Sequence, residues 1–218
     1  MKPLVLCLSF AFAATTAATA EDAGSTPYLA LYRVLSPIAG IEAYDRLVAV
    51  ERIESKLPGV RAGDIRIVIH ARSGAIPVAV GDGGAVKFPV SDALRAENPP
   101  VETNQPKGSL ALIVNVGLRG AGALRVPWSD IEAGLEQAKA FYAKNRGDAA
   151  PAISGVEVHF PPGGSAMLTI EGKDERLLMA DPAGRIVVTR DMIAGEAPPE
   201  LVFSRAPDFV LPYSEGRP

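Results

Sequence analysis

Apolar and polar side chains alternate with a period of two in several short segments of the chain, a pattern typical of β-strands. The clearest segment is 64–72, where three isoleucines occupy alternate positions: Ile65, Ile67 and Ile69. Segments 85–90 and 166–171 alternate in the same way, and segment 109–117 is largely apolar, as expected for a strand covered on both faces. Turns rich in proline and glycine separate these segments, and the whole pattern predicts a mainly β protein.

One helix is predicted, at about residues 130–145. Ser129 and Glu132 have the spacing of a capping box at its start, and Gly147 can supply a left-handed residue at its end. An apolar stripe at helical spacing runs through the segment: Ile131, Leu135, Ala138 and Phe141 or Tyr142. Segment 41–57 combines helix-forming charges with strand-like valines, so a helix and a strand fit it equally well.

Two parts of the chain are similar to each other. At an offset of 99 residues, segment 82–100 aligns with segment 181–199, with matching aspartates, a matching glutamate and matching proline pairs. Upstream, an offset of 89 places His70 on His159. Similarity at a regular spacing is the signature of an internal repeat. We therefore predict two tandem β-sandwich-like repeats joined by the helix, with a single α+β domain as the alternative.

On this basis the chain is expected to divide into five segments. They are a signal peptide, an N-terminal segment, a first β repeat, a linker helix and a second β repeat: 1–20, 21–58, 59–126, 127–150 and 151–218. The signal peptide is predicted from Lys2, from the apolar run between Pro3 and Ala14, and from the small residues before a cleavage site near Ala20. Export of this kind implies a periplasmic or secreted protein.

Composition and charge exclude several classes of protein. The only cysteine, Cys7, lies within the predicted signal peptide, so a mature chain would have neither a disulfide nor a thiolate metal site. Without Lys2, 21 Lys and Arg face 25 Asp and Glu, a formal net charge of −4. A negative chain without clustered basic residues argues against nucleic-acid binding. No apolar segment after the signal is long enough to span a membrane.

The sequence assigns no catalytic residue and no cofactor. It contains no H-E-x-x-H, no G-x-S-x-G and no P-loop. The two histidines, His70 and His159, are candidate metal ligands if the repeats bring them together, and are otherwise solvent-facing strand positions. Recurring carboxylates, such as Asp82 and Asp181, would suit acid–base chemistry on sugars, but their recurrence in turns favours roles as caps.

A polar loop is the best candidate for ligand binding. Segment 97–109, ENPPVETNQPKGS, begins with Glu-x-Pro-Pro, which recurs at 196–199 and is therefore interpreted as part of the repeat. Four polar side chains are distinctive to the first copy: Thr103, Asn104, Gln105 and Lys107. We expect that any ligand held by this loop contacts these four residues.

The chain resembles a family of uncharacterised secreted proteobacterial proteins that contain a domain of unknown function. The resemblance rests on ESKLPGVRAGDIRI, on VKFPVSDALRAENPPVETNQPKGSLAL and on the capped helix that follows them. It implies an envelope location and carries over no catalytic residues.

Two functions fit these observations. The first is a non-enzymatic periplasmic or secreted protein that binds a protein or an envelope component. The alternative is a cell-envelope hydrolase that acts on sugar or peptidoglycan through paired carboxylates.

Overall fold

The computed structural model describes residues 23–120, 122–161, 163, 165–172, 175–193 and 199–215. The predicted signal peptide, 1–20, lies outside these residues. The prediction of a mainly β protein is confirmed, with 42% of the described residues in strands and 29% in helices. None of the described helices combines the length and the apolar composition needed to cross a membrane.

The elements of the first half begin with a strand and a helix and end with two long strands. In chain order they are β1 (Ala23–Pro27), α1 (Tyr28–Leu35), η2 (Ser36–Ile38), η3 (Ile41–Ala43), β2 (Leu47–Ser55), η4 (Ala62–Asp64), β3 (Ile67–Ala71), β4 (Gly74–Val78), η5 (Asp82–Gly84), α2 (Asp92–Glu97), β5 (Pro100–Pro106) and β6 (Leu110–Leu118).

The second half has a similar order of elements, with a longer helix. They are β7 (Arg125–Pro127), α3 (Trp128–Arg146), η6 (Gly147–Ala149), β8 (Ile153–His159), β9 (Met167–Glu171), β10 (Arg176–Met179), β11 (Arg185–Thr189), η7 (Arg190–Ile193), β12 (Glu200–Phe203) and β13 (Phe209–Ser214).

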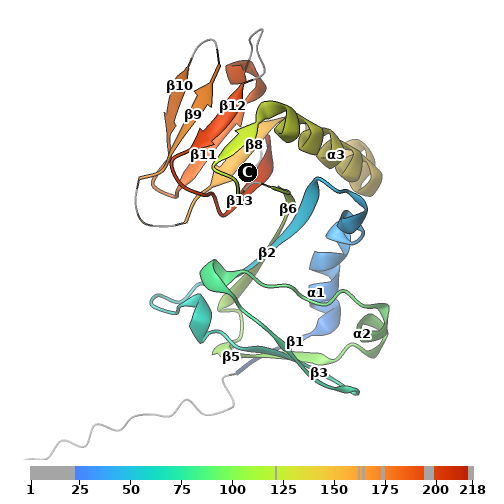
Figure 1. Ribbon diagram of the computed structural model, residues 1–218. Coiled ribbons are helices and arrows are strands. Elements are labelled where there is room, and N and C mark those ends of the chain that lie inside the picture. The colour runs from blue at the N-terminus through green and yellow to red at the C-terminus, as the bar shows by residue number, and fades with distance from the viewer. Residues whose placement is uncertain are drawn as a thin grey trace, which may run out of the picture.

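The strands form four antiparallel sheets. Their orders are β1-β5-β3-β4, β10-β9-β12-β7, β11-β8-β13 and the pair β2-β6. The first sheet lies in the lower half of Figure 1 with α1 and α2, and the second and third lie in the upper half with α3. The pair β2-β6 runs between the two halves.

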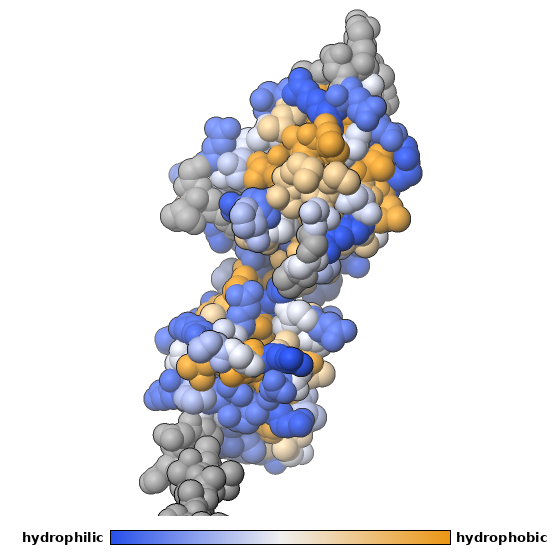
Figure 2. Space-filling model, turned by 90° about the vertical axis from the view of Figure 1, so that its left-hand side faces the viewer, coloured by the Kyte–Doolittle hydropathy of each residue, from blue (hydrophilic) through white to orange (hydrophobic). Residues whose placement is uncertain are grey.

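Each half has its own hydrophobic core, and the β2-β6 pair contributes to both. Ile53, near the end of β2, packs in the core of the first half together with Tyr28 and Phe88. Leu47, at the start of the same strand, packs in the core of the second half with Leu135 of α3. The two halves, which form two lobes in the space-filling view (Figure 2), are therefore joined through the two longest strands.

Several sequence-based predictions are confirmed. Residues Ile67–Ala71 form β3, with Ile67 and Ile69 buried, and Met167–Glu171 form β9. The predicted apolar stripe of the long helix is buried along its length. The ambiguous segment 41–57 forms the strand β2 after a single 3-10 turn.

Two local predictions are wrong. Segment 85–90 alternates in sequence but makes only isolated bridges, from Ala85 to Arg52 and from Val86 to Val80. Ser129 does not cap α3, because the helix begins one residue earlier at Trp128, whose backbone N–H donates to the carbonyl of Pro199 over 2.9 Å.

Candidate functional site

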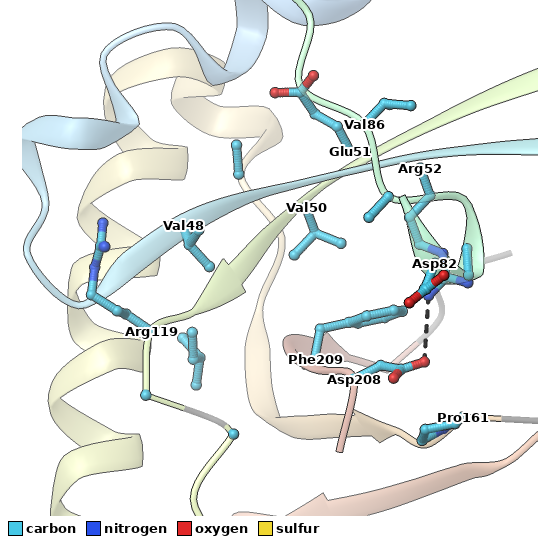
Figure 3. A pocket seen from close by; sticks show the side chains of 16 residues that line it. Val48, Val50, Glu51, Arg52, Asp82, Val86, Arg119, Pro161, Asp208 and Phe209 are labelled. Carbon is cyan, nitrogen blue, oxygen red and sulfur yellow. Dashed lines mark hydrogen bonds and ion pairs between the residues drawn. The ribbon is translucent and has the colours of Figure 1, made fainter. Parts of the chain in front are cut away.

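A groove lies between the two halves, along β2 (Figure 3). Its cavity volume is about 830 Å³, which falls in the range of ~300–1,000 Å³ typical of ligand sites. Its walls come from β2, from η5 and the residues after it, from the end of β6 and from the start of β13. The two halves of the chain therefore both contribute to it.

The floor of the groove is apolar. Val48 and Val50 of β2 point into it, and the ring of Phe209 lies beside them (Figure 3). Val48 keeps 37% of its surface exposed, unlike the valines of either core. The close approach of β6 to this floor requires a glycine at position 117, because a Cβ there would lie 2.6 Å from Val50 Cγ2.

Arg52 connects the two halves at one end of the groove. Its guanidinium donates to the carbonyl of Gly83, lies 3.6 Å from the carboxylate of Asp208, and is positioned 5.3 Å from the centre of the Phe209 ring. Phe209 in turn stacks on His159 with ring centroids 4.5 Å apart. This end of the groove carries Asp82 as well as Asp208, so carboxylates surround the arginine (Figure 3).

Arg119 marks the opposite end (Figure 3). Its guanidinium donates to the carbonyl of Leu47 over 2.8 Å, and the residue is exposed. No described carboxylate forms an ion pair with it. The groove is therefore polarised along β2, with Arg119, outside any described ion pair, at one end and two carboxylates beside Arg52 at the other.

Glu51 directs the course of the segment that leaves the groove. Its carboxylate accepts a hydrogen bond from the Phe88 backbone N–H over 2.9 Å, while its own carbonyl accepts one from Val86. The phenolic hydroxyl of Tyr28 then donates to the carbonyl of Pro89 over 2.6 Å. These contacts keep the segment after Val86 out of the ladder with β2, and the Phe88 side chain packs in the first core.

Replacing Glu51 with glutamine is expected to stabilise the protein at neutral pH. Burial raises the pKa of Glu51 above its ordinary value, so the folded state binds the proton more tightly than the unfolded state. The cost of ionising Glu51 is therefore absent below about pH 4 and increases as the pH rises through the ordinary carboxyl range. Denaturant unfolding of both proteins between pH 3.5 and 7.5 measures this difference.

The exposed Glu54, on the same strand, supplies the matched control. Glu54→Gln removes an exposed carboxylate and should change the free energy of unfolding by less than about 0.5 kcal/mol. A stability difference between wild type and Glu51→Gln that does not vary with pH would contradict the assignment.

The two histidines lie on strands in opposite halves of the molecule, β3 and β8 (Figure 1). His70 Nε2 lies 2.9 Å from the Glu102 carboxylate, and His159 Nε2 lies 2.7 Å from that of Glu157. Burial lowers the pKa of His159, against the opposing effect of Glu157. Within the described residues, no group of three or more His, Cys, Asp or Glu side chains is arranged to hold a metal ion.

The four predicted loop residues lie at the end of β5 and just after it. The side chain of Asn104 accepts from the Arg66 N–H and donates to the carbonyl of Asp64, each over 2.8 Å. Gln105 is buried. Thr103 and Lys107 line a second, smaller cavity of about 180 Å³ inside the first half. The large groove is lined by none of the four.

Replacing Asn104 with alanine is expected to lower the free energy of unfolding by about 1 kcal/mol, because two exposed backbone groups lose a hydrogen-bond partner that water only partly replaces. Such a cost would show that this amide holds the chain near Asp64. Lys107→Ala removes an exposed neighbour and serves as the control, with a change within about 0.5 kcal/mol. Thermal or denaturant unfolding measures both, and equal stability of the two variants would contradict the structural role.

Two of the repeated carboxylates bind backbone N–H groups close to them in space. Asp181 accepts from the N–H groups of Ala183 and Arg185, and Glu97 accepts from the N–H of Arg72. Of the repeated carboxylates that the structure describes, only Asp82 lines the groove. The recurrence of Asp82 in a turn favours a role as a cap, so the sequence did not single it out for this groove.

Searches against family models, curated proteins and solved structures found no match to the chain. The function is therefore argued from the groove.

Proposed function

We propose that the protein is a non-enzymatic periplasmic or secreted binding protein, and that the groove between its halves holds a protein or an envelope component. The observation that carries the proposal is the groove itself, with an apolar floor and charges of opposite sign at its two ends. Apolar area supplies affinity, and a few charged groups orient the ligand. The location rests on the signal-like residues 1–20.

We also propose that the chain is an internal duplication, with units larger than the β repeats predicted from sequence. The strand order β1-β5-β3-β4 of one half corresponds to β7-β12-β9-β10 of the other. The N–H of Tyr28 donates to Pro99 and that of Trp128 to Pro199, both over 2.9 Å and 100 positions apart. In this division α3 is the counterpart of α1.

The hydrolase alternative has weaker support. Hydrolysis of a glycosidic bond needs an acid of raised pKa that faces a second carboxylate across the site. Glu51 has a raised pKa, but its carboxylate points to the face of β2 opposite the side chain of Val50 (Figure 3). Asp208 pairs with Arg52. If folded Asp82→Asn and Asp208→Asn variants lost an envelope hydrolysis that the wild type performs, the alternative would replace binding.

Photocrosslinking in the producing cells tests the proposed site. A photoreactive amino acid at Val48, in the groove, is expected to give discrete adducts, whereas one at the exposed Glu132 of α3 is expected to give none of the same mass. Identical adducts from both positions, or none from Val48, would count against the groove as the binding site.

A further inference from the structure

One edge of β2 is open along part of its length. β2 pairs with β6 on one side, and on the other side only the segment around Ala85 and Val86 reaches it. In an antiparallel pair, the N–H and C=O groups of alternate residues point to the same side. The carbonyls of Leu47 and Glu51 bond to Arg119 and Val86 on the side away from β6. The backbone groups of Ala49, halfway between them, must therefore point the same way.

No described residue hydrogen-bonds to the backbone N–H or C=O of Ala49 on that side. The groove reaches this edge, because five consecutive residues of β2 line it, from Val48 to Arg52. A cavity that touched only one face of a strand would be lined by every second residue, since successive side chains point to opposite faces. The open edge of β2 is therefore part of the groove wall.

The corresponding edge in the second half is filled by a strand of the same chain. β11 pairs antiparallel with β8, with Arg185 opposite His159. In the first half, Ala85 lies opposite Arg52 in the same antiparallel sense; Ala85 precedes Arg185 by 100 positions, and Arg52 precedes His159 by 107. Beyond Val86 the chain no longer pairs with the backbone of β2, because the Glu51 carboxylate binds the Phe88 N–H and the Tyr28 hydroxyl binds the Pro89 carbonyl. No described segment of the first half therefore lies along β2 in the way that the rest of β11 lies along β8.

We propose that the groove binds the extended C-terminus of another polypeptide, which adds antiparallel to the open edge of β2 in the place that β11 occupies beside β8. This inference rests on the proposed binding function and on the proposed duplication. The main chain of the incoming segment bonds to Ala49, and alternate side chains contact Val48, Val50 and Phe209. Addition of a strand to a sheet edge is a common mode of peptide recognition.

Charge and length define the occupant. An antiparallel segment runs from the Arg52 end of the groove toward Arg119, so its C-terminal end meets the free guanidinium. Arg119 already occupies the Leu47 carbonyl, which a longer strand would need, so the added strand ends there.

Val86 closes the other end of the open edge, because its N–H donates to the Glu51 carbonyl. About four residues fit between them, roughly 13 Å of extended chain. Arginine pairs well with a carboxylate, so a free C-terminus complements this end.

The experiment uses the full chain and a pool of random heptapeptides with free C-termini, together with the same pool amidated. We expect the immobilised protein to enrich peptides with apolar side chains at alternate positions from the free-acid pool. For the best peptide, fluorescence anisotropy should show an affinity about tenfold lower after amidation. Enrichment from neither pool would overturn the inference.

Backbone N-methylation of the best peptide tests strand addition without altering the protein. Methylation of the residue whose N–H faces the Ala49 carbonyl should weaken binding at least tenfold, while methylation of its two neighbours changes it less than about twofold. Loss at every position, or at none, would overturn strand addition.

Two protein variants complete the test. Arg119→Gln should weaken the free-acid peptide about tenfold and leave the amide unchanged, whereas Arg66→Gln, at an exposed arginine outside the groove, should change neither. Equal weakening of both peptides by Arg119→Gln would overturn capture of the carboxylate.

Val48→Arg, which fills the groove floor, separates the two proposals. If it abolishes binding while N-methylation shows no alternation, the groove binds ligand but not as a strand. If Val48→Arg leaves peptide binding intact, the groove is not the site and the proposed function fails as well.

Discussion

Replacing Gly155 with alanine is expected to lower the free energy of unfolding by about 3 kcal/mol, near the upper end of the usual cost of overpacking. Gly155 lies in β8, the central strand of its sheet, between β11 and β13. A Cβ at this position would overlap the carbonyl oxygen of Val188 and lie 2.8 Å from the Cα of Thr189. Relief requires that β11 move away from β8, at the cost of ladder hydrogen bonds. Denaturant unfolding gives the difference directly.

Gly63→Ala is the matched control. Its added Cβ would meet no heavy atom within 4 Å, and its φ lies outside the left-handed region. A change within about 0.5 kcal/mol is expected there. If Gly155→Ala were as stable as Gly63→Ala, the close pairing of β8 with β11 would be wrong.

Replacing Tyr28 with phenylalanine is expected to cost about 2 kcal/mol, since it leaves two partly buried backbone groups without a partner. The Tyr28 hydroxyl donates to the carbonyl of Pro89 and accepts from the N–H of Ser91 over 3.1 Å. The residue has no exposed surface, and burial raises its pKa. The substitution also releases the segment that these bonds hold away from β2.

Tyr32→Phe, on the same helix, provides the comparison. The Tyr32 hydroxyl makes longer, exposed hydrogen bonds of 3.3 Å to Asp92 and 3.4 Å to Arg95. Its removal should change stability by less than about 0.5 kcal/mol. A smaller loss for Tyr28→Phe than for Tyr32→Phe, measured by denaturant unfolding, would refute the role assigned to the Tyr28 hydroxyl.

The elements that could be predicted from sequence are those whose pattern follows directly from their own burial. Ile67 and Ile69 alternate because β3 has one face on the first core. Leu135 and Phe141 recur at helical spacing because α3 lies with one side on the second core. Such patterns require no knowledge of the partner element.

The failures occur where a distant residue decides the local structure. Val86 and Phe88 are both buried, as their alternation suggests. The Phe88 N–H, however, bonds to the side-chain carboxylate of Glu51 and not to the backbone carbonyl of a neighbouring strand. Trp128 begins α3 because its amide is bonded to Pro199. Alternation and capping motifs report burial and local preference, and neither specifies a partner far along the chain.

The groove could not be predicted for the same reason. Val48, Arg119 and Phe209 meet there from three separate parts of the chain, and none belongs to a recognisable motif. The predicted polar loop drew attention through its composition, but Asn104 is engaged by Asp64 and Arg66. A side chain that satisfies backbone groups looks as polar in sequence as one that binds a ligand.

Amide hydrogen exchange at Ala49, with and without the selected peptide, is the most direct test of strand addition in the groove. Ala49 has an N–H on the open side of β2, whereas Val50 should already bond to β6. The peptide is expected to slow exchange of the Ala49 amide at least tenfold and to leave that of Val50 unchanged. An Ala49 amide whose exchange does not change in the saturated complex would contradict the proposal.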